Sequence, residues 1–386
     1  MKTNRNAEEW QHEQRQPKTS TPLRIVFVIS SLSMGGAQRV VALLANGLSE
    51  RGHFVSILTF EPKDAQPYFP IAPNVTVQAL NLARPSANSF SALARGIGRL
   101  VSLRGAIQKY APSVVIPFMD STNVLTLLAL LGTHIPVIAC ERTNPCFNPL
   151  GYVWSYLRRA TYPLAARITA QTKAAAAMLP GRTVVLPNPV SLPEQATGPW
   201  PLPPGPQLVA MGRLSDEKGF QLLIQAFARI APVLPAWKLV IVGEGPMRQR
   251  LEAQVSQAGL AERILLPGHS PTPSSVLRTA SLFVLPSRFE GFPNALCEAM
   301  AYGLPAVAFD CPSGPAEILR HGVDGLLVPA QNVDDLTAAL TSLMVDESTR
   351  LRMAQRAPEI LERFGLERVL KMWEDLLNEV VHLRTP

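Results

Sequence analysis

One segment of the sequence places two carboxylates on either side of an expected helix start. Residues 287–298, SRFEGFPNALCE, follow an apolar run at 282–286. Pro293 suits the first helical position because it has no N–H to leave unsatisfied. The amides of the next three residues then fall in the first turn, where backbone N–H groups lack partners within the helix. The segment predicts an anion cradle formed by the amides of Asn294, Ala295 and Leu296.

This cradle suits a ligand that carries hydroxyls on both sides of a phosphate group. Glu290 would accept sugar hydroxyls, the amides would hold phosphate, and Glu298 would accept a second diol. A nucleoside diphosphate sugar has this layout. Each hydrogen bond to a carboxylate contributes roughly 1.5–3 kcal/mol, which is more than a surface ion pair contributes. The alternative is that both acids only lie where a helix dipole favours negative charge.

Two cations follow another expected strand, at 207–212. Arg213 and Lys218 would stand at the carboxyl end of this strand. A diphosphate suits the pair, because a guanidinium can fork over two oxygens whereas an ammonium is a mobile point charge. The alternative is a solvated turn in which Lys218 pairs with Asp216 or Glu217.

A glycine pair near the amino terminus offers a similar geometry. Gly35 and Gly36 lie where an expected strand, 24–30, leads into an expected helix, 36–51. Glycines at this point allow a ligand to approach free N–H groups at the helix start. The segment matches neither GxGxxG nor GxxxxGK[ST], which argues against a simple dinucleotide oxidoreductase and a P-loop NTPase. The alternative is a tight turn with no ligand.

Short β-branched runs alternate with helical stretches, and this alternation predicts an α/β fold with parallel sheets covered by helices. The expected strands of the first half are 24–30, 54–60, 75–80, 113–118, 136–140, 167–170 and 183–186. Those of the second half are 207–212, 238–243, 263–267, 282–286, 305–309 and 325–328. The chain therefore predicts two doubly wound, Rossmann-like sheets whose strand ends face a central cleft.

The length of 386 residues is too great for one hydrophobic core, so we expect two domains. A disordered tail at 1–22, without a secretory signal, would precede a first domain at 23–187. A proline-rich linker at 188–206 would lead to a second domain at 207–365, and 366–386 would form a helix packing back toward the first domain. The composition, 47% hydrophobic and 17% charged, excludes a mainly disordered chain.

Charge and residue spacing also limit which cofactors, partners and cellular compartment we expect. The net charge of +7 comes from scattered basic residues, which argues against nucleic-acid binding. No Asp-x-Asp stands at a strand end, so we expect no metal and no other cofactor. Reduced thiols in a cytoplasmic protein fit the cysteines best, since they form neither a CxxC pair nor a set with histidines at metal-ligand spacing. These cysteines are Cys140, Cys146, Cys297 and Cys311.

Together the motifs resemble those of the retaining glycosyltransferases of family 4, which have the two-domain GT-B fold. The resemblance covers about residues 23–380. It rests on the glycine loop at 35–36, GRL at 212–214 with KG at 218–219, VGEGP at 242–246, the 287–298 segment and DGLLVP at 324–329.

The resemblance implies transfer of a sugar from a nucleoside diphosphate sugar to an acceptor hydroxyl, with retention at the anomeric carbon. It gives Arg213 and Lys218 the donor diphosphate, Glu290 the sugar hydroxyls and Glu298 the ribose. The expected donor-binding residues are Gly35, Gly36, Arg213, Lys218, Gly243, Gly268, Glu290, Asn294, Ala295, Leu296 and Glu298.

The acceptor side departs from the pattern of the family. Family members often carry a histidine at the end of a first-domain strand, whereas residues 117–123, PFMDSTN, contain none. Asp120 and Glu141 follow expected strands, and either could orient an acceptor hydroxyl. Both join Arg213, Lys218 and Glu290 as candidate catalytic residues. The alternative for each of the two is a loop residue or a helix cap.

Residues 118–123, 141–145 and 311–318 resemble a narrower group, bacterial enzymes that extend polysaccharides or glycoprotein glycans. This resemblance implies UDP-galactose, UDP-GalNAc or UDP-GlcNAc as donor and an acceptor on polyprenyl diphosphate. A basic amphipathic stretch at 84–110 suits docking to the cytoplasmic face of a membrane, or else packs as an ordinary helix. The competing functions are a GT-B-like nucleotide-sugar epimerase or phosphorylase and a non-catalytic nucleotide-sugar-binding protein.

Overall fold

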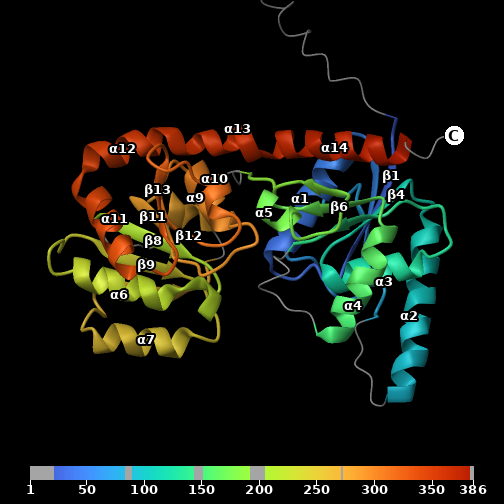
Figure 1. Ribbon diagram of the computed structural model, residues 1–386, viewed down its shortest axis with the longest axis horizontal. Coiled ribbons are helices and arrows are strands. Elements are labelled where there is room, and N and C mark those ends of the chain that lie inside the picture. The colour runs from blue at the N-terminus through green and yellow to red at the C-terminus, as the bar shows by residue number, and fades with distance from the viewer. Residues whose placement is uncertain (1–20, 83–88, 143–150, 192–204, 271–272, 383–386) are drawn as a thin grey trace, which may run out of the picture. The chain divides into compact units, whose positions relative to one another are not determined.

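The structure is a computed structural model that describes residues 21–82, 89–142, 151–191, 205–270 and 273–382 (Figure 1). Most of the expected tail and linker lie outside these ranges. By its contacts the chain divides into two compact units. The first comprises Met1–Ala139, Leu164–Ala166 and Glu374–Pro386, and the second comprises Cys140–Pro163 and Arg167–Trp373. The domain boundaries given above stay predictions.

The first unit contains a four-stranded parallel sheet with the strand order β3-β2-β1-β4. Three of its strands are mostly apolar and buried, as expected of a parallel sheet covered on both faces, whereas the edge strand β3 is partly exposed. The strands are β1 (Arg24–Ile29), β2 (Phe54–Thr59), β3 (Thr76–Ala79) and β4 (Val114–Pro117), and the helices are α1 (Gly36–Glu50), α2 (Ser89–Lys109) and α3 (Asp120–Ala129).

A further parallel sheet has the order β5-β6-β7. A single parallel bridge between Val115 and Val137 connects β4 to the residue that precedes β5. The elements are β5 (Ile138–Cys140), β6 (Arg167–Ala170) and β7 (Thr183–Val185), with α4 (Tyr152–Thr161), η2 (Tyr162–Leu164) and α5 (Lys173–Ala176).

The sheet of the second unit has six parallel strands in the order β10-β9-β8-β11-β12-β13. Chain order reverses between β8 and β11, which makes the gap between their ends the topological switch point. The strands are β8 (Gln207–Met211), β9 (Lys238–Val242), β10 (Ile264–Gly268), β11 (Leu282–Leu285), β12 (Ala306–Asp310) and β13 (Gly325–Pro329).

Helices cover both faces of this sheet. They are η3 (Asp216–Lys218), α6 (Phe220–Ile230), α7 (Arg248–Gln257), α8 (Pro273–Leu277), α9 (Asn294–Ala301), α10 (Pro315–Ile318), α11 (Val333–Val345), α12 (Glu347–Arg356), η4 (Ala357–Glu359) and α13 (Ile360–Phe364). The last helix, α14 (Leu366–His382), begins in the second unit and continues into the first.

Two hydrophobic cores lie on opposite faces of the six-stranded sheet, because successive strand residues point to opposite sides. Leu208 and Ala210 of β8 contribute to one core, together with α6, α7 and α11. Val209, between them, contributes to the other core, together with α8, α9 and α10. Figure 1 shows α6 and α9 on opposite sides of the sheet. The predicted α/β class with two Rossmann-like folds is confirmed.

Candidate functional site

The switch point of the second unit holds an ion pair. Lys218 comes from η3, after β8, and Glu290 comes from the loop after β11. Lys218 Nζ lies 2.7 Å from Glu290 Oε1, and the Ser287 hydroxyl donates to the same oxygen at 2.6 Å. Glu290 is 7% exposed. Ligands of open α/β sheets bind outside the strand ends at this point, so the two residues lie where a ligand is expected.

Glycines allow the loops around this pair to touch. Gly219 has φ +66°, and a Cβ there would lie 2.0 Å from the carbonyl oxygen of Pro286. A Cβ on Gly243 would lie 1.9 Å from the carbonyl oxygen of Gly212. Both are backbone contacts, which cannot yield as a flexible side chain can. Only glycine fits at either position.

Arg213 lies two residues after the end of β8, and its side chain is exposed. Its guanidinium makes no hydrogen bond or ion pair within the described residues. The carboxylate partner of Lys218 is Glu290, not Asp216 or Glu217, as the solvated-turn alternative required. Asp216 instead accepts a hydrogen bond from Gln221. One free cation and one cation paired to an acid therefore follow the same strand.

The start of α9 differs from the sequence-based expectation. Pro293 caps the helix, and Asn294 is its first residue. The N–H of Asn294 donates to the Phe292 carbonyl at 2.9 Å, and that of Leu296 donates to the Pro293 carbonyl at 3.1 Å. The prediction that all three amides are unsatisfied is therefore wrong for these two, because turn hydrogen bonds occupy them. Ala295 N–H has no hydrogen-bond partner within the described residues.

The remaining donor-side candidates lie in the same unit. Glu298 is half-buried in α9, about one turn after the helix begins at Asn294. Gly243 N–H donates to the Gly268 carbonyl at 2.8 Å, which joins the ends of β9 and β10. Both glycines thus lie at the carboxyl edge of the sheet that also carries Arg213. Their contact with a base stays a prediction.

In the first unit the glycine pair lies at the start of α1, directly after β1. Gly35 has an extended backbone and supplies no side-chain cap. Arg39 N–H is the first to donate back, to the Gly35 carbonyl at 3.0 Å. Within the described residues, the N–H groups of Gly36, Ala37 and Gln38 have no partner. This geometry is compatible both with phosphate binding and with a plain turn.

Asp120 follows a strained residue. Met119, between β4 and α3, has φ +78° and ψ +151°, a region that residues other than glycine rarely adopt. This turn places Asp120 at the first position of α3, where the helix dipole favours an acid. Asp120 is 5% exposed, and its carboxylate makes no hydrogen bond or ion pair to any described residue. The strain gave no signal in the sequence.

Glu141, the second acceptor-side candidate, belongs to the second unit. It follows β5 and is 2% exposed. Its Oε2 accepts the hydroxyl of Tyr162 at 2.7 Å, and its N–H donates to the Thr169 carbonyl at 2.9 Å. A protein hydroxyl therefore occupies the carboxylate in this structure. Most of the motif that follows, from Thr143 on, lies outside the described residues.

The first unit also contains an apolar cavity of about 160 Å³ at the carboxyl end of its sheet. It lies between strand ends and the helices α2 and α3. Its lining residues are Ser30, Phe60, Leu82, Arg99, Leu100, Leu103 and Leu125.

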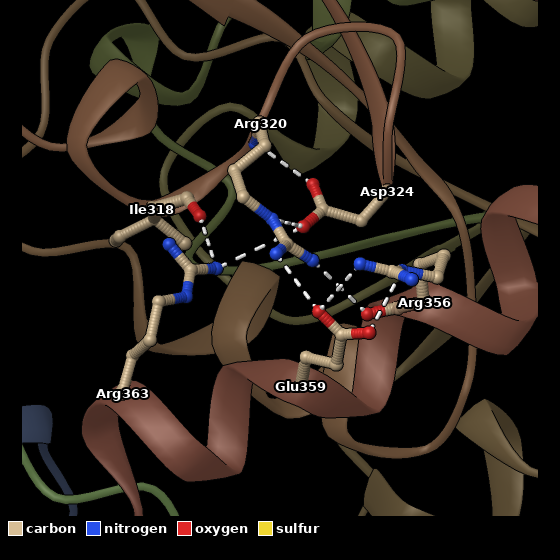
Figure 2. Close-up of polar contacts among 6 residues, drawn as sticks. All are labelled: Ile318, Arg320, Asp324, Arg356, Glu359 and Arg363. Carbon is tan, nitrogen blue, oxygen red and sulfur yellow. Dashed lines mark hydrogen bonds and ion pairs between the residues drawn. The ribbon is translucent and has the colours of Figure 1, made fainter.

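A network of arginines and acids in the second unit joins residues 318–324 to η4 and α13 (Figure 2). Asp324, fully buried before β13, accepts from Arg320 Nε at 2.6 Å, and Arg363 lies 3.8 Å away. The ring of Phe364, next in sequence to Arg363, contacts that of Phe292 edge-on, with centroids 5.7 Å apart. The network thus fixes α13 against the loop that carries Glu290.

Three further observations concern metals, thiols and membranes. Across the described ranges, no group of three or more His, Cys, Asp or Glu residues is placed to hold a metal ion. Cys140, Cys297 and Cys311 are buried and form no disulfide within the described residues, and Cys146 lies outside those residues. Burial raises the pKa of the Cys140 thiol to about 11. No helix in the described part of the chain is long and apolar enough to span a bilayer.

The strand order of the second unit is that of an open, doubly wound α/β sheet with a topological switch point. The family described as "Glycosyl transferases group 1" matches residues 201–360, and "Glycosyltransferase Family 4" matches residues 34–192. The chain therefore belongs to the glycosyltransferases of the family 4 type, as the motifs predicted.

The chain is similar to two bacterial proteins over different shares of its length. An N-acetyl-D-galactosaminyltransferase of Campylobacter jejuni, named for an undecaprenol-linked glycan, is 26% identical over 363 residues, which are 93% of this chain and 99% of that protein. An exopolysaccharide phosphotransferase of Streptomyces coelicolor is 42% identical over 181 residues, 47% of this chain but only 19% of that protein.

Solved structures show the fold. Sucrose-phosphate synthase from Thermosynechococcus elongatus has a TM-score of 0.80 at 18% identity, and the match covers 93% of this chain and 100% of that one. Anabaena HepE in complex with UDP and glucose has a TM-score of 0.74 at 19% identity, covering 92% and 99% of the two chains.

Proposed function

We propose that the protein transfers a hexose or N-acetylhexosamine from a UDP-sugar to an acceptor hydroxyl, with retention at the anomeric carbon. The observation that carries this proposal is the Lys218–Glu290 pair beside the free guanidinium of Arg213, at the switch point. The donors that we favour are UDP-galactose, UDP-GalNAc and UDP-GlcNAc. Support comes from the two Campylobacter relatives named as N-acetylgalactosaminyltransferases and from HepE, solved with UDP.

The charges suggest how the leaving group departs. Arg213 and Lys218 would hold the diphosphate, whose negative charge grows as the bond to the sugar breaks. Glu290 would then exchange its contact with Lys218 for a hydroxyl of the donor sugar. A leaving phosphate oxygen would take the proton of the acceptor hydroxyl. We further propose that these cations and the helix amides stabilise the diphosphate without a metal ion.

The acceptor that we propose is a lipid-linked oligosaccharide of bacterial polysaccharide or glycan assembly. The two Campylobacter relatives are named for undecaprenol-linked glycans. Asp120 is the stronger candidate for orienting the acceptor hydroxyl, because its carboxylate has no partner among the described residues whereas that of Glu141 accepts from Tyr162. The apolar cavity with Arg99 lies in the same unit as Asp120.

A lipid-linked acceptor calls for a protein at the cytoplasmic face of the membrane, and α2 supports such a location. Ile97 and Val101 of this helix are 58% and 65% exposed. Their spacing of four residues places them on one face, and Arg104 lies one turn further along it. Exposed aliphatic residues beside a cation suit the interface of an anionic membrane.

Donor hydrolysis tests the function directly. Purified protein is incubated with each UDP-sugar and followed by NMR, and every positive is repeated with Glu290→Ala. Slow hydrolysis of one UDP-sugar that is lost in the variant supports transfer and identifies the donor, and the configuration of the released sugar reports retention. Binding without turnover would favour a non-catalytic binding protein, and a changed sugar on intact UDP would favour an epimerase. Absence of binding to every nucleotide sugar would contradict the proposal.

A further inference from the structure

A chain of hydrogen bonds reaches the start of α9 from buried residues of the same unit. Arg142 Nη1 donates to Asn188 Oδ1 at 2.6 Å, and Gln171 Nε2 donates to the same oxygen at 2.9 Å. Asn188 Nδ2 in turn donates to Asn294 Oδ1 at 2.8 Å. Asn188 is 3% exposed, and Arg142 and Gln171 are each 8% exposed. Asn188 and its two donors are thus almost sealed from water, whereas Asn294 is half-buried.

The direction of this chain is fixed by one residue that can only donate. A guanidinium has no acceptor, so Asn188 must turn its oxygen toward Arg142 and its nitrogen toward Asn294. Asn294 must then present its own oxygen to Asn188. Its NH₂ group is left as a donor on the other side of the amide, and it makes no hydrogen bond to any described residue.

The donor end of the chain does not change with pH in the physiological range. Burial lowers the pKa of Arg142, but an arginine starts so high that it stays protonated. The neighbouring Cys140 thiol has its pKa raised to about 11 and stays neutral. Asn188 therefore always meets a cation, and the orientation of both amides is constant.

We propose that Arg142 and Asn188 are positioning residues that hold the Asn294 amide as a hydrogen-bond donor to the diphosphate of the nucleotide. This inference rests on the proposed function. It assigns to the side chain of Asn294 the role that its backbone N–H cannot play, since that N–H donates to Phe292. The leaving diphosphate gains a neutral donor at the start of α9, four residues after Glu290.

The competing explanation is that these hydrogen bonds only hold residue 188 against α9 and do not orient a donor. The variant Asn188→Asp distinguishes the two explanations. The carboxylate would accept from Arg142 and Gln171 as before, and a charged pair would strengthen that contact. Its other oxygen, however, would accept from Asn294, so that the Asn294 amide inverts and presents its oxygen to the phosphate. The contact between residue 188 and Asn294 is preserved, while the Asn294 NH₂ group no longer faces the phosphate.

The experiment measures binding of UDP and of uridine by calorimetry to the full chain and to Asn188→Asp, Asn294→Ala and the double variant. We expect each single variant to weaken UDP binding about tenfold or more, because a hydrogen bond to a charged group is lost, and to leave uridine binding unchanged. The double variant should bind UDP no more weakly than Asn294→Ala, since both changes remove one interaction.

Two results would overturn the inference. One is a ratio of UDP to uridine affinity in Asn294→Ala equal to that of the wild type. The other is a loss in the double variant that equals the product of the single losses. If Asn188→Asp fails to fold, Asn294→Asp at a half-buried surface position gives the same test. Failure of the wild type to bind UDP at all would instead contradict the proposed function, and the inference with it.

Discussion

At the scale of single residues, Lys218 and Glu290 neutralise each other at the point where the donor is proposed to bind. A diphosphate would offer Lys218 a second anionic partner, and a sugar hydroxyl would offer Glu290 a neutral one. The two residues therefore share the energy of ligand binding. Replacing them one at a time should affect the two halves of the donor differently.

Lys218→Ala and Glu290→Ala are both expected to keep the fold and to lower turnover by about a hundredfold or more, because each removes a contact at the reacting group. The binding of UDP should distinguish them. Lys218→Ala weakens it, whereas Glu290→Ala leaves it near the wild-type value and removes the preference for one sugar. Calorimetry with UDP and UDP-sugars measures both effects. Wild-type turnover in either variant would contradict the site.

The residue types of this site were predictable, but their pairing was not. The only acidic partners that the sequence suggested for Lys218, and only as an alternative, were Asp216 and Glu217, whereas its partner, Glu290, lies 72 positions away. Only the strand order brings the two loops together. Asn188 gave no signal, because a lone Asn among prolines is typical of a linker, and Arg142 stood out only as part of the 141–145 motif, with no role of its own.

At the scale of elements, the strand-to-helix turns determine which groups face a ligand. The predicted strands agree with the structure to within about two residues, because buried parallel strands are continuous apolar runs. The turns are less predictable. The N–H of Asn294 donates to the carbonyl of Phe292, two residues earlier, and Met119 adopts a positive φ that glycine usually adopts. Local sequence fixes neither of these details.

The strain at Met119 can be measured. Met119→Gly should be more stable than Met119→Ala by about 1 kcal/mol or more, because alanine keeps the Cβ that the positive φ disfavours. At an ordinary position the order is reversed, since glycine has more freedom in the unfolded chain. Urea unfolding of both variants gives the difference. A more stable alanine variant would show that Met119 carries no such strain.

The buried acid Asp324, labelled in Figure 2, should matter for stability and not for chemistry. Asp324→Ala removes a fully buried carboxylate from Arg320 and Arg363, and we expect a loss of about 3 kcal/mol in the free energy of unfolding. Chemical denaturation measures the loss. Glu347→Ala, at an exposed acid of α12, is the matched control and should change the stability by less than about 0.5 kcal/mol.

The contact between α14 and the start of β2 makes stability depend on pH. His53 Nδ1 accepts from Leu23 N–H, and its Nε2 lies 3.6 Å from Glu374. Burial lowers the pKa of His53 from its ordinary 6.5, against the opposing effect of Glu374. Below about pH 6.5 the unfolded chain thus binds a proton that the folded chain does not, and stability falls as the pH falls.

Replacing this histidine should flatten that dependence. His53→Gln is expected to be less stable than the wild type at pH 7.5, because packing is lost, but to lose less stability on going to pH 5.5. Urea midpoints at the two pH values give the comparison. An equal loss in both proteins would mean that His53 titrates as it does in the unfolded chain.

At the scale of the whole molecule, an excess of seven positive charges is available to attract an anionic surface. Vesicles that contain anionic lipid should therefore retain the protein at low salt and release it at high salt, when the charges are screened. Val101→Asp, at an exposed position of α2, should weaken retention about tenfold. Sedimentation measures both. Retention by neutral vesicles, or none by anionic ones, would contradict docking through charge.

The glycine contacts at the switch point also constrain how this fold can diversify. A Cβ added at Gly219 or Gly243 would lie 2.0 or 1.9 Å from a neighbouring carbonyl oxygen, so no larger residue can be accommodated without moving a strand end. In a saturation-mutagenesis screen these two positions should tolerate as little change as the acids do. New sugar preferences would have to arise from exposed loop positions. The backbone at the strand ends would stay fixed while the side chains of the surrounding loops change.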